Sequence, residues 1–211
     1  MTFTLCMETH ITFVLDSSGS MAAIEDDTKG GFNSFLEEQR DEPGSATVTL
    51  YDFNTNVSRA YEGESIEDAP KLDDNYTPSG RTALHDAIAT AIDETTDYLA
   101  TIEESNRPSN VIVVVLTDGK ENASETTENI VRDIVEQRRE KHGWEFLFVG
   151  ANQDAALTAS SMGMDPNRSL DMDHSGEGAR NAYQSTSERI SQARREGSTG
   201  GYTDEDRRKQ D

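Results

Sequence analysis

The stretch FVLDSSGSM, residues 13–21, decides the fold, because an apolar run ends there in a cluster of small oxygen-bearing side chains. The run begins two residues earlier (ITFVL, 11–15). A short, nearly uninterrupted run of β-branched and aromatic residues is typical of a strand buried on both faces. Asp16, Ser18 and Ser20 follow at the carboxyl end of that strand. The sequence therefore predicts a buried strand that delivers a carboxylate and several hydroxyls to one edge of a sheet.

Two later segments repeat this apolar pattern, VIVVVL (111–116) and WEFLFV (144–149). Between the three runs, segments 82–103 and 125–140 place apolar residues on one helical stripe and most charged residues on the other. Parallel neighbouring strands need crossover connections of this kind, usually helices that pack on the sheet. We therefore expect three central parallel strands joined by helices.

An antiparallel hairpin is expected at one edge of the sheet. ATVTLYDFN (46–54) alternates apolar and polar residues, and a turn-forming Asn-Thr-Asn leads into VSRAY (57–61). A helix over about 21–40 precedes the hairpin, although the pair Gly30-Gly31 weakens it by about 1 kcal/mol per glycine relative to alanine. Close packing against another helix would explain the two glycines.

The remaining elements complete an α/β fold. Residues 152–164 predict a helix, and 168–172 predict a short strand. The order of elements predicts a Rossmann-like, doubly wound, mostly parallel central sheet with one antiparallel edge strand and helices on both faces. In such a sheet a ligand crevice lies at the carboxyl ends of the strands.

Five oxygen-bearing residues are expected to meet at that crevice: Asp16, Ser18, Ser20, Thr82 and Asp118. Thr82 opens a helix after a loop, and Asp118 leaves the end of the second buried strand. Hydroxyl and carboxylate ligands without nitrogen or sulfur suit Mg²⁺, or less specifically Mn²⁺ and Ca²⁺, and argue against zinc or copper. An Asp-x-Ser-x-Ser stretch alone would also fit a helix N-cap, but Thr82 and Asp118 in register favour a metal site.

The motifs that carry these residues resemble the metal-ion-dependent adhesion site of the von Willebrand factor type A (vWA) domain. They are Asp16-x-Ser18-x-Ser20, the loop Gly80-Arg81-Thr82 and the strand end Thr117-Asp118-Gly119. The resemblance covers about residues 9–170, and it is strongest to small stand-alone prokaryotic and viral members of the family.

The resemblance implies a role for each residue. Ser18, Ser20 and Thr82 would contact the ion, whereas Asp16 and Asp118 often act through water. An Asp or Glu of a partner protein would complete the coordination, so that the domain works as a metal-dependent interaction module. Arg81 stands where small residues are common, and we expect it to pair with a local carboxylate rather than to guide an acidic partner.

We divide the chain into four parts. Residues 1–8 form an N-terminal extension, in which Met7 could equally be the start, and 9–175 form the vWA-like domain. Residues 176–196 form a C-terminal helix, and 197–211, with almost no apolar content, are expected to be a disordered acidic and polar tail.

The acidic composition restricts the partners and the source. Asp and Glu number 41 against 19 Lys and Arg, which gives a net charge of −22, so nucleic acid and anionic membranes are not expected to bind. Lysine is scarce beside abundant carboxylate, as in proteins of organisms that keep molar salt in their cells, so we expect a halophilic source. Cys6 is the single cysteine, which suits a cytoplasmic location, or a virion if the chain is encoded by a virus.

No catalytic residues are expected. A phosphatase of the haloacid dehalogenase type would place a second aspartate two residues after Asp16, where this chain has Ser18. SSGSM is not the Gly-x-Ser-x-Gly elbow of a serine hydrolase. The alternative that stays open is a structural or assembly subunit of a larger complex, such as chaperone-like machinery or a virus particle. The oligomeric state is not predicted.

Overall fold

The computed structural model describes residues 8–152 and 154–211, so almost all of the expected extension, 1–8, lies outside the described residues. Six strands form one sheet in the order β3-β2-β1-β4-β5-β6, and every neighbouring pair is parallel except β2 with β3. This confirms the predicted fold class. The strands are β1 (Thr9–Asp16), β2 (Ala46–Phe53), β3 (Val57–Ser65), β4 (Asn110–Thr117), β5 (Glu145–Ala151) and β6 (Ser169–Met172).

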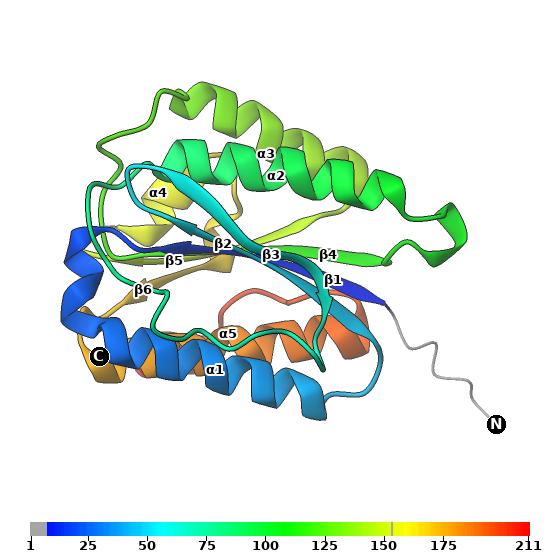
Figure 1. The fold of residues 1–211 in the computed structure, drawn as a ribbon, viewed down its shortest axis with the longest axis horizontal. Coiled ribbons are helices and arrows are strands. Elements are labelled where there is room, and N and C mark those ends of the chain that lie inside the picture. Colours follow the sequence, from blue (N-terminus) through cyan, green and yellow to red (C-terminus); the bar gives the residue numbers. More distant parts are fainter. Residues whose placement is uncertain (1–7, 153) are drawn as a thin grey trace.

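Helices cover both faces of the sheet (Figure 1). On one face lie α1 (Glu25–Asp41) and α5 (Gly176–Glu196), and on the other lie α2 (Leu84–Thr101), α3 (Glu128–His142) and α4 (Ala155–Ser161). Short 3₁₀ turns cover Gly19–Ile24, Glu104–Asn106 and Pro166–Arg168. Among the described residues, no helix is long and apolar enough to cross a membrane.

The strand register brings the polar strand ends to one edge. Leu15 of β1 pairs with Leu116 of β4, so Asp16 and Thr117 end their strands at the same height. All residues of β1 are buried, and so are all residues of β4 except the first. The two strands are apolar on both faces because helices cover both faces, which leaves their carboxyl ends as the place where polar side chains can gather.

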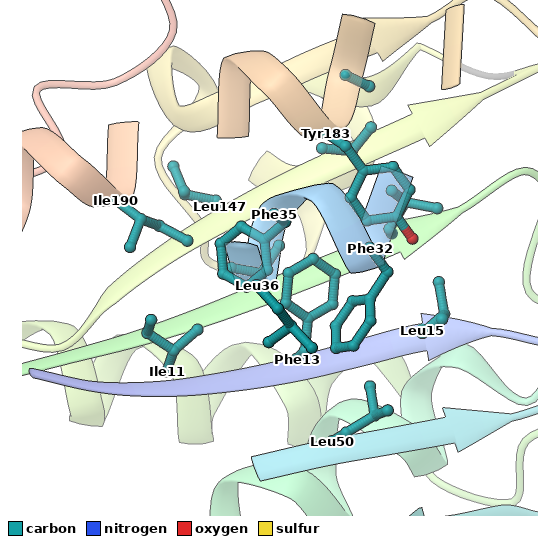
Figure 2. Packing of buried hydrophobic residues seen from close by; sticks show 14 of the residues in the cluster. Ile11, Phe13, Leu15, Phe32, Phe35, Leu36, Leu50, Leu147, Tyr183 and Ile190 are labelled. Carbon is teal, nitrogen blue, oxygen red and sulfur yellow. The ribbon is translucent and has the colours of Figure 1, made fainter. Parts of the chain in front are cut away.

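Aromatic side chains fill the core between the sheet and the α1–α5 pair (Figure 2). The ring of Phe13 lies 5.2 Å from that of Phe32 and stacks 6.0 Å from that of Tyr183 on α5. A Cβ atom on Gly31 would lie 2.3 Å from the Tyr183 ring, so α1 approaches α5 closely only because this position is glycine. Gly30 has open space around it, so helix packing explains only one of the two glycines.

The expectation of a disordered tail over 197–211 is wrong. Tyr202 is only 7% exposed, and its hydroxyl lies 2.8 Å from that of Thr186 on α5. A final helix, α6 (Asp204–Arg208), begins with a capping box made by Thr203. The segment is ordered by contacts with α5, which directly precedes it, and with β6, which lies further back in the chain. The low apolar content of the segment itself gives no sign of these contacts.

This C-terminal segment also covers the outer edge of β6. The Tyr202 N–H donates to the Asn167 carbonyl at 3.0 Å, and the Arg207 guanidinium donates to the Ser169 carbonyl at 2.9 Å. An uncovered edge strand invites pairing with another chain. The segment therefore serves as a cap for one end of the sheet.

Candidate metal centre

Asp16 is the buried end of β1 and its carboxylate is held on both sides. One oxygen, Oδ1, accepts from the Ser18 N–H at 2.6 Å, and Oδ2 accepts from the Thr117 hydroxyl at 2.5 Å. The residue is fully buried. Burial raises the pKa of Asp16 to about 6, although the hydrogen bonds from Thr117 and Ser18 act in the opposite direction. The site thus contains a carboxylate that is costly to ionise without a compensating positive charge.

Two serine hydroxyls link this loop to the end of β4. The Ser18 and Ser20 hydroxyls lie 3.2 Å apart, and the Ser20 hydroxyl donates to Oδ1 of Asp118 at 2.6 Å. Ser20 lies on the 3₁₀ turn that follows β1, and the strand register brings that turn beside Asp118. These three side chains form one continuous polar cluster.

Thr82 joins the same cluster from the loop before α2. A Cβ atom on Gly119 would lie 2.9 Å from the Thr82 hydroxyl and 3.6 Å from that of Ser20, so both hydroxyls point at the same small space beside a glycine. The Thr82 N–H donates to the Asn122 side-chain oxygen at 3.0 Å, and the Asn122 N–H donates to the Thr82 carbonyl at 3.0 Å. These contacts fix the loop before α2 against the loop after β4.

The structure therefore brings all five predicted residues together at one edge of the sheet. That they bind a metal stays a prediction, but the donor set fits a hard divalent cation. Asp16 and Asp118 are 0% and 1% exposed, and in the described part of the chain neither carboxylate forms an ion pair with a lysine or arginine. No group of three His, Cys, Asp or Glu side chains among the described residues could hold a metal, so the hydroxyls are essential to any site here.

The sequence analysis missed His174, which lies in the loop between β6 and α5. Its Nε2 atom lies 2.8 Å from Oδ2 of Asp118. The histidine lies two residues after the short strand predicted at 168–172, and the carboxyl end of that strand lies at the same edge as the other site residues. That position was the available signal, because no motif includes this residue.

Two basic residues lie close in sequence to the site residues, Arg81 directly before Thr82 and Lys120 two residues after Asp118. Arg81 and Lys120 are both exposed, and neither side chain makes an ion pair or hydrogen bond with any residue in the described ranges. The expectation that Arg81 pairs with a local carboxylate is thus wrong. A nearby carboxylate, Glu121, accepts instead from the backbone N–H groups of Ala123, Ser124 and His85, which lowers its pKa even though burial acts to raise it.

This chain belongs to the von Willebrand factor type A domain family, whose family model matches residues 10–193. The match runs past residue 175 into α5, as far as residue 193. Domains of this family often act in metal-dependent adhesion or protein interaction. No curated protein matches the sequence significantly.

Solved structures share the fold at low sequence identity. Proximal thread matrix protein 1 from the mussel byssus has a TM-score of 0.62 at 16% identity over 88% of this chain, and a second structure of it is described as having a zinc-occupied MIDAS motif. The pilus adhesin SpaC from Lactobacillus rhamnosus GG, in an open conformation, has a TM-score of 0.65 at 13% identity over 88% of this chain. The chain spans 46% of the byssus protein and 30% of SpaC.

Proposed function

We propose that the chain is a metal-dependent protein interaction module that binds Mg²⁺ at Asp16, Ser18, Ser20, Thr82 and Asp118 and recognises an acidic residue of a partner protein. The observation that carries this proposal is the pair of buried carboxylates beside three hydroxyls, with no lysine or arginine paired to either carboxylate within the described residues. A bound divalent cation supplies positive charge that offsets the buried carboxylates and attracts a carboxylate from outside.

Magnesium is favoured by the donor chemistry. All five residues offer oxygen atoms, which suit Mg²⁺ and, less specifically, Mn²⁺ or Ca²⁺. The neutral hydroxyls add dipoles without adding negative charge, so a cation held here keeps its attraction for a further anion. The zinc recorded in the byssus protein makes Zn²⁺ a competitor that belongs in any binding assay.

The rim of the site supports an acidic protein partner. The chain carries a net charge of −22, which on average repels anions. Arg81 and Lys120 are exposed, they neighbour Thr82 and Asp118 in sequence, and neither forms an ion pair with a described carboxylate. They would reduce the local repulsion where an acidic side chain approaches. The same net charge argues against nucleic acid and membranes as partners.

We propose a binding role and no catalytic role. As a nucleophile, Asp16 would need a free carboxylate oxygen open to substrate, yet both of its oxygens accept hydrogen bonds and the residue is 0% exposed. The geometry therefore gives a phosphatase no support. A cytoplasmic location and a high-salt source remain predictions from composition.

Isothermal titration calorimetry with Mg²⁺, Mn²⁺ and Zn²⁺ tests the metal site directly. The wild type should bind Mg²⁺, and Ser20→Ala should lose most of the affinity because it removes one hydroxyl and the hydrogen bond to Asp118. Ser105→Ala, an exposed serine in a 3₁₀ turn remote in sequence from the site motifs, is the matched control and should bind like the wild type. Equal affinity in wild type and Ser20→Ala would refute the assignment.

Pull-downs from source lysate at high salt test the partner. Proteins recovered with Mg²⁺ should be lost with chelator and with Ser20→Ala. The variant Arg81→Ser/Lys120→Ser should keep metal affinity but recover less partner. Recovery that chelator does not change would favour a permanently assembled subunit, which buries a larger surface.

A further inference from the structure

The carboxylate of Asp118 is held on both of its oxygens by side chains from different parts of the chain. Oδ1 accepts from the Ser20 hydroxyl at 2.6 Å, and Oδ2 contacts Nε2 of His174 at 2.8 Å. Since a carboxylate oxygen only accepts, the imidazole donates through Nε2–H. Asp118 is completely buried at its side chain, whereas the His174 side chain is 27% exposed. The imidazole thus lies between the carboxylate and solvent.

The loop that carries His174 is held firmly by its neighbours. The N–H of Asp173 donates to the Gln210 side chain of the C-terminal segment at 3.1 Å, and the Asp173 carbonyl accepts from the Ser175 N–H at 2.8 Å. Ser175 caps α5, because its hydroxyl accepts from the Gly178 N–H at 3.0 Å. A Cβ atom on Gly178 would lie 2.2 Å from the Asp173 carbonyl oxygen. The loop is therefore fixed on both sides of the histidine.

The start of α1 packs against the same loop. A Cβ atom on Gly176 would lie 2.2 Å from the Asp27 carboxylate, and Arg180 of α5 forms an ion pair with that carboxylate. Glycine at position 176 is what permits this close approach. Contacts with α1 and α5 therefore hold the loop that carries the imidazole, and the residues that make these contacts are not among the five proposed ligands.

From this arrangement we propose that His174 is a positioning residue of the metal centre, which holds Asp118 in the orientation that metal binding needs. The proposal rests on the proposed function. The terminal torsion of an aspartate is broad and roughly two-fold, so a carboxylate fixed at one oxygen only can still rotate. With the imidazole on Oδ2, the other oxygen stays beside Ser20, where the hydroxyls gather. Removing such an outer partner of a metal ligand typically costs about 10–100-fold in metal affinity.

Two amide substitutions at His174 separate the donor from the bulk of the side chain. Gln places its amide nitrogen near the position of Nε2 and can still donate to Asp118, whereas Asn is too short to do so. We expect His174→Asn to weaken Mg²⁺ binding by about 10-fold or more, and His174→Gln to retain most of the wild-type affinity. His142→Asn, at an exposed residue that ends α3, is the matched control and should leave the affinity unchanged.

Calorimetric dissociation constants for Mg²⁺ and Mn²⁺ are the readout, and thermal unfolding in chelator checks that each variant is folded. If His174 had a merely structural role, His174→Asn would lower the unfolding temperature without changing the affinity for metal. His174→Gln would then restore neither quantity preferentially. If His174→Asn does not fold, His174→Phe replaces it, with a ring of similar size and no donor. Wild-type affinity in His174→Asn, or equal weakening in Asn and Gln, would overturn the inference, whereas no metal binding by the wild type would overturn the proposed function itself.

Discussion

Replacing the buried carboxylate of Asp16 by an amide should make the metal-free protein more stable at neutral and alkaline pH. Burial raises the pKa of Asp16 from 3.8 to about 6 in the folded state. The folded state therefore binds this proton more tightly than the unfolded chain does. The contribution of this bound proton to the free energy of unfolding is complete below about pH 4, and it is lost as the pH rises through 6.

The size of the effect follows from the shift. A change of about 2 pKa units, at about 1.4 kcal/mol per unit, corresponds to roughly 3 kcal/mol of stability lost between pH 4 and pH 8. Asp16→Asn resembles the protonated acid in shape and does not ionise. We therefore expect equal stability of wild type and variant near pH 4, and a variant that is more stable by roughly 3 kcal/mol at pH 8.

Urea unfolding in chelator at fixed salt, from pH 4 to pH 8, measures this difference. Comparison at each pH cancels other titrating groups, such as His10, whose pKa burial lowers to about 4. At pH 8, Mg²⁺ at 100 times its dissociation constant should stabilise the wild type by about 2.7 kcal/mol and leave the variant unchanged. A difference between the two proteins that stays constant with pH would refute the reasoning.

Further predictions concern the packing of α5 and the C-terminal segment. Gly31→Ala should lower the free energy of unfolding by about 2 kcal/mol, because overpacking against the Tyr183 ring costs about 3 and the gain in helix propensity is about 1. Gly30→Ala lies in open space on the same helix and should raise the free energy of unfolding by about 1 kcal/mol. Denaturant unfolding measures both variants, and a change of the same sign in the two would contradict this packing. Tyr202→Ala should cost about 3 kcal/mol by the same measurement, since a buried aromatic ring and its hydrogen bond to Thr186 are lost, and no change would indicate that the segment is not packed.

The sheet and its layers could be predicted from local sequence. The apolar run before Asp16 and the run over 111–116 became β1 and β4, because a strand covered by helices on both faces is mostly apolar along its length. The hairpin over 46–61 also formed as expected, since alternation and a turn signal act within a few residues. These features need no knowledge of distant contacts.

The surroundings of the site could not be predicted in the same way. Arg81 was expected to pair with a carboxylate, but nearby Glu121 is occupied by backbone N–H groups. His174 was passed over because no motif includes it, although it contacts Asp118 from the loop after β6. Both outcomes depend on how loops from different strands meet, and spacing along the chain does not encode that meeting in any simple pattern.

The sequence by itself determined which segments form strands and helices, which family the chain belongs to, and which five oxygen-bearing residues follow the strands or open a helix. It could do so because hydrophobic periodicity and short motifs are local properties. Only the tertiary structure decided that His174 holds Asp118, that Arg81 and Lys120 are without partners among the described residues, and that residues 197–211 are packed. The physical reason is that these outcomes arise from contacts between segments far apart in the chain, and such contacts form only when the whole sheet is assembled.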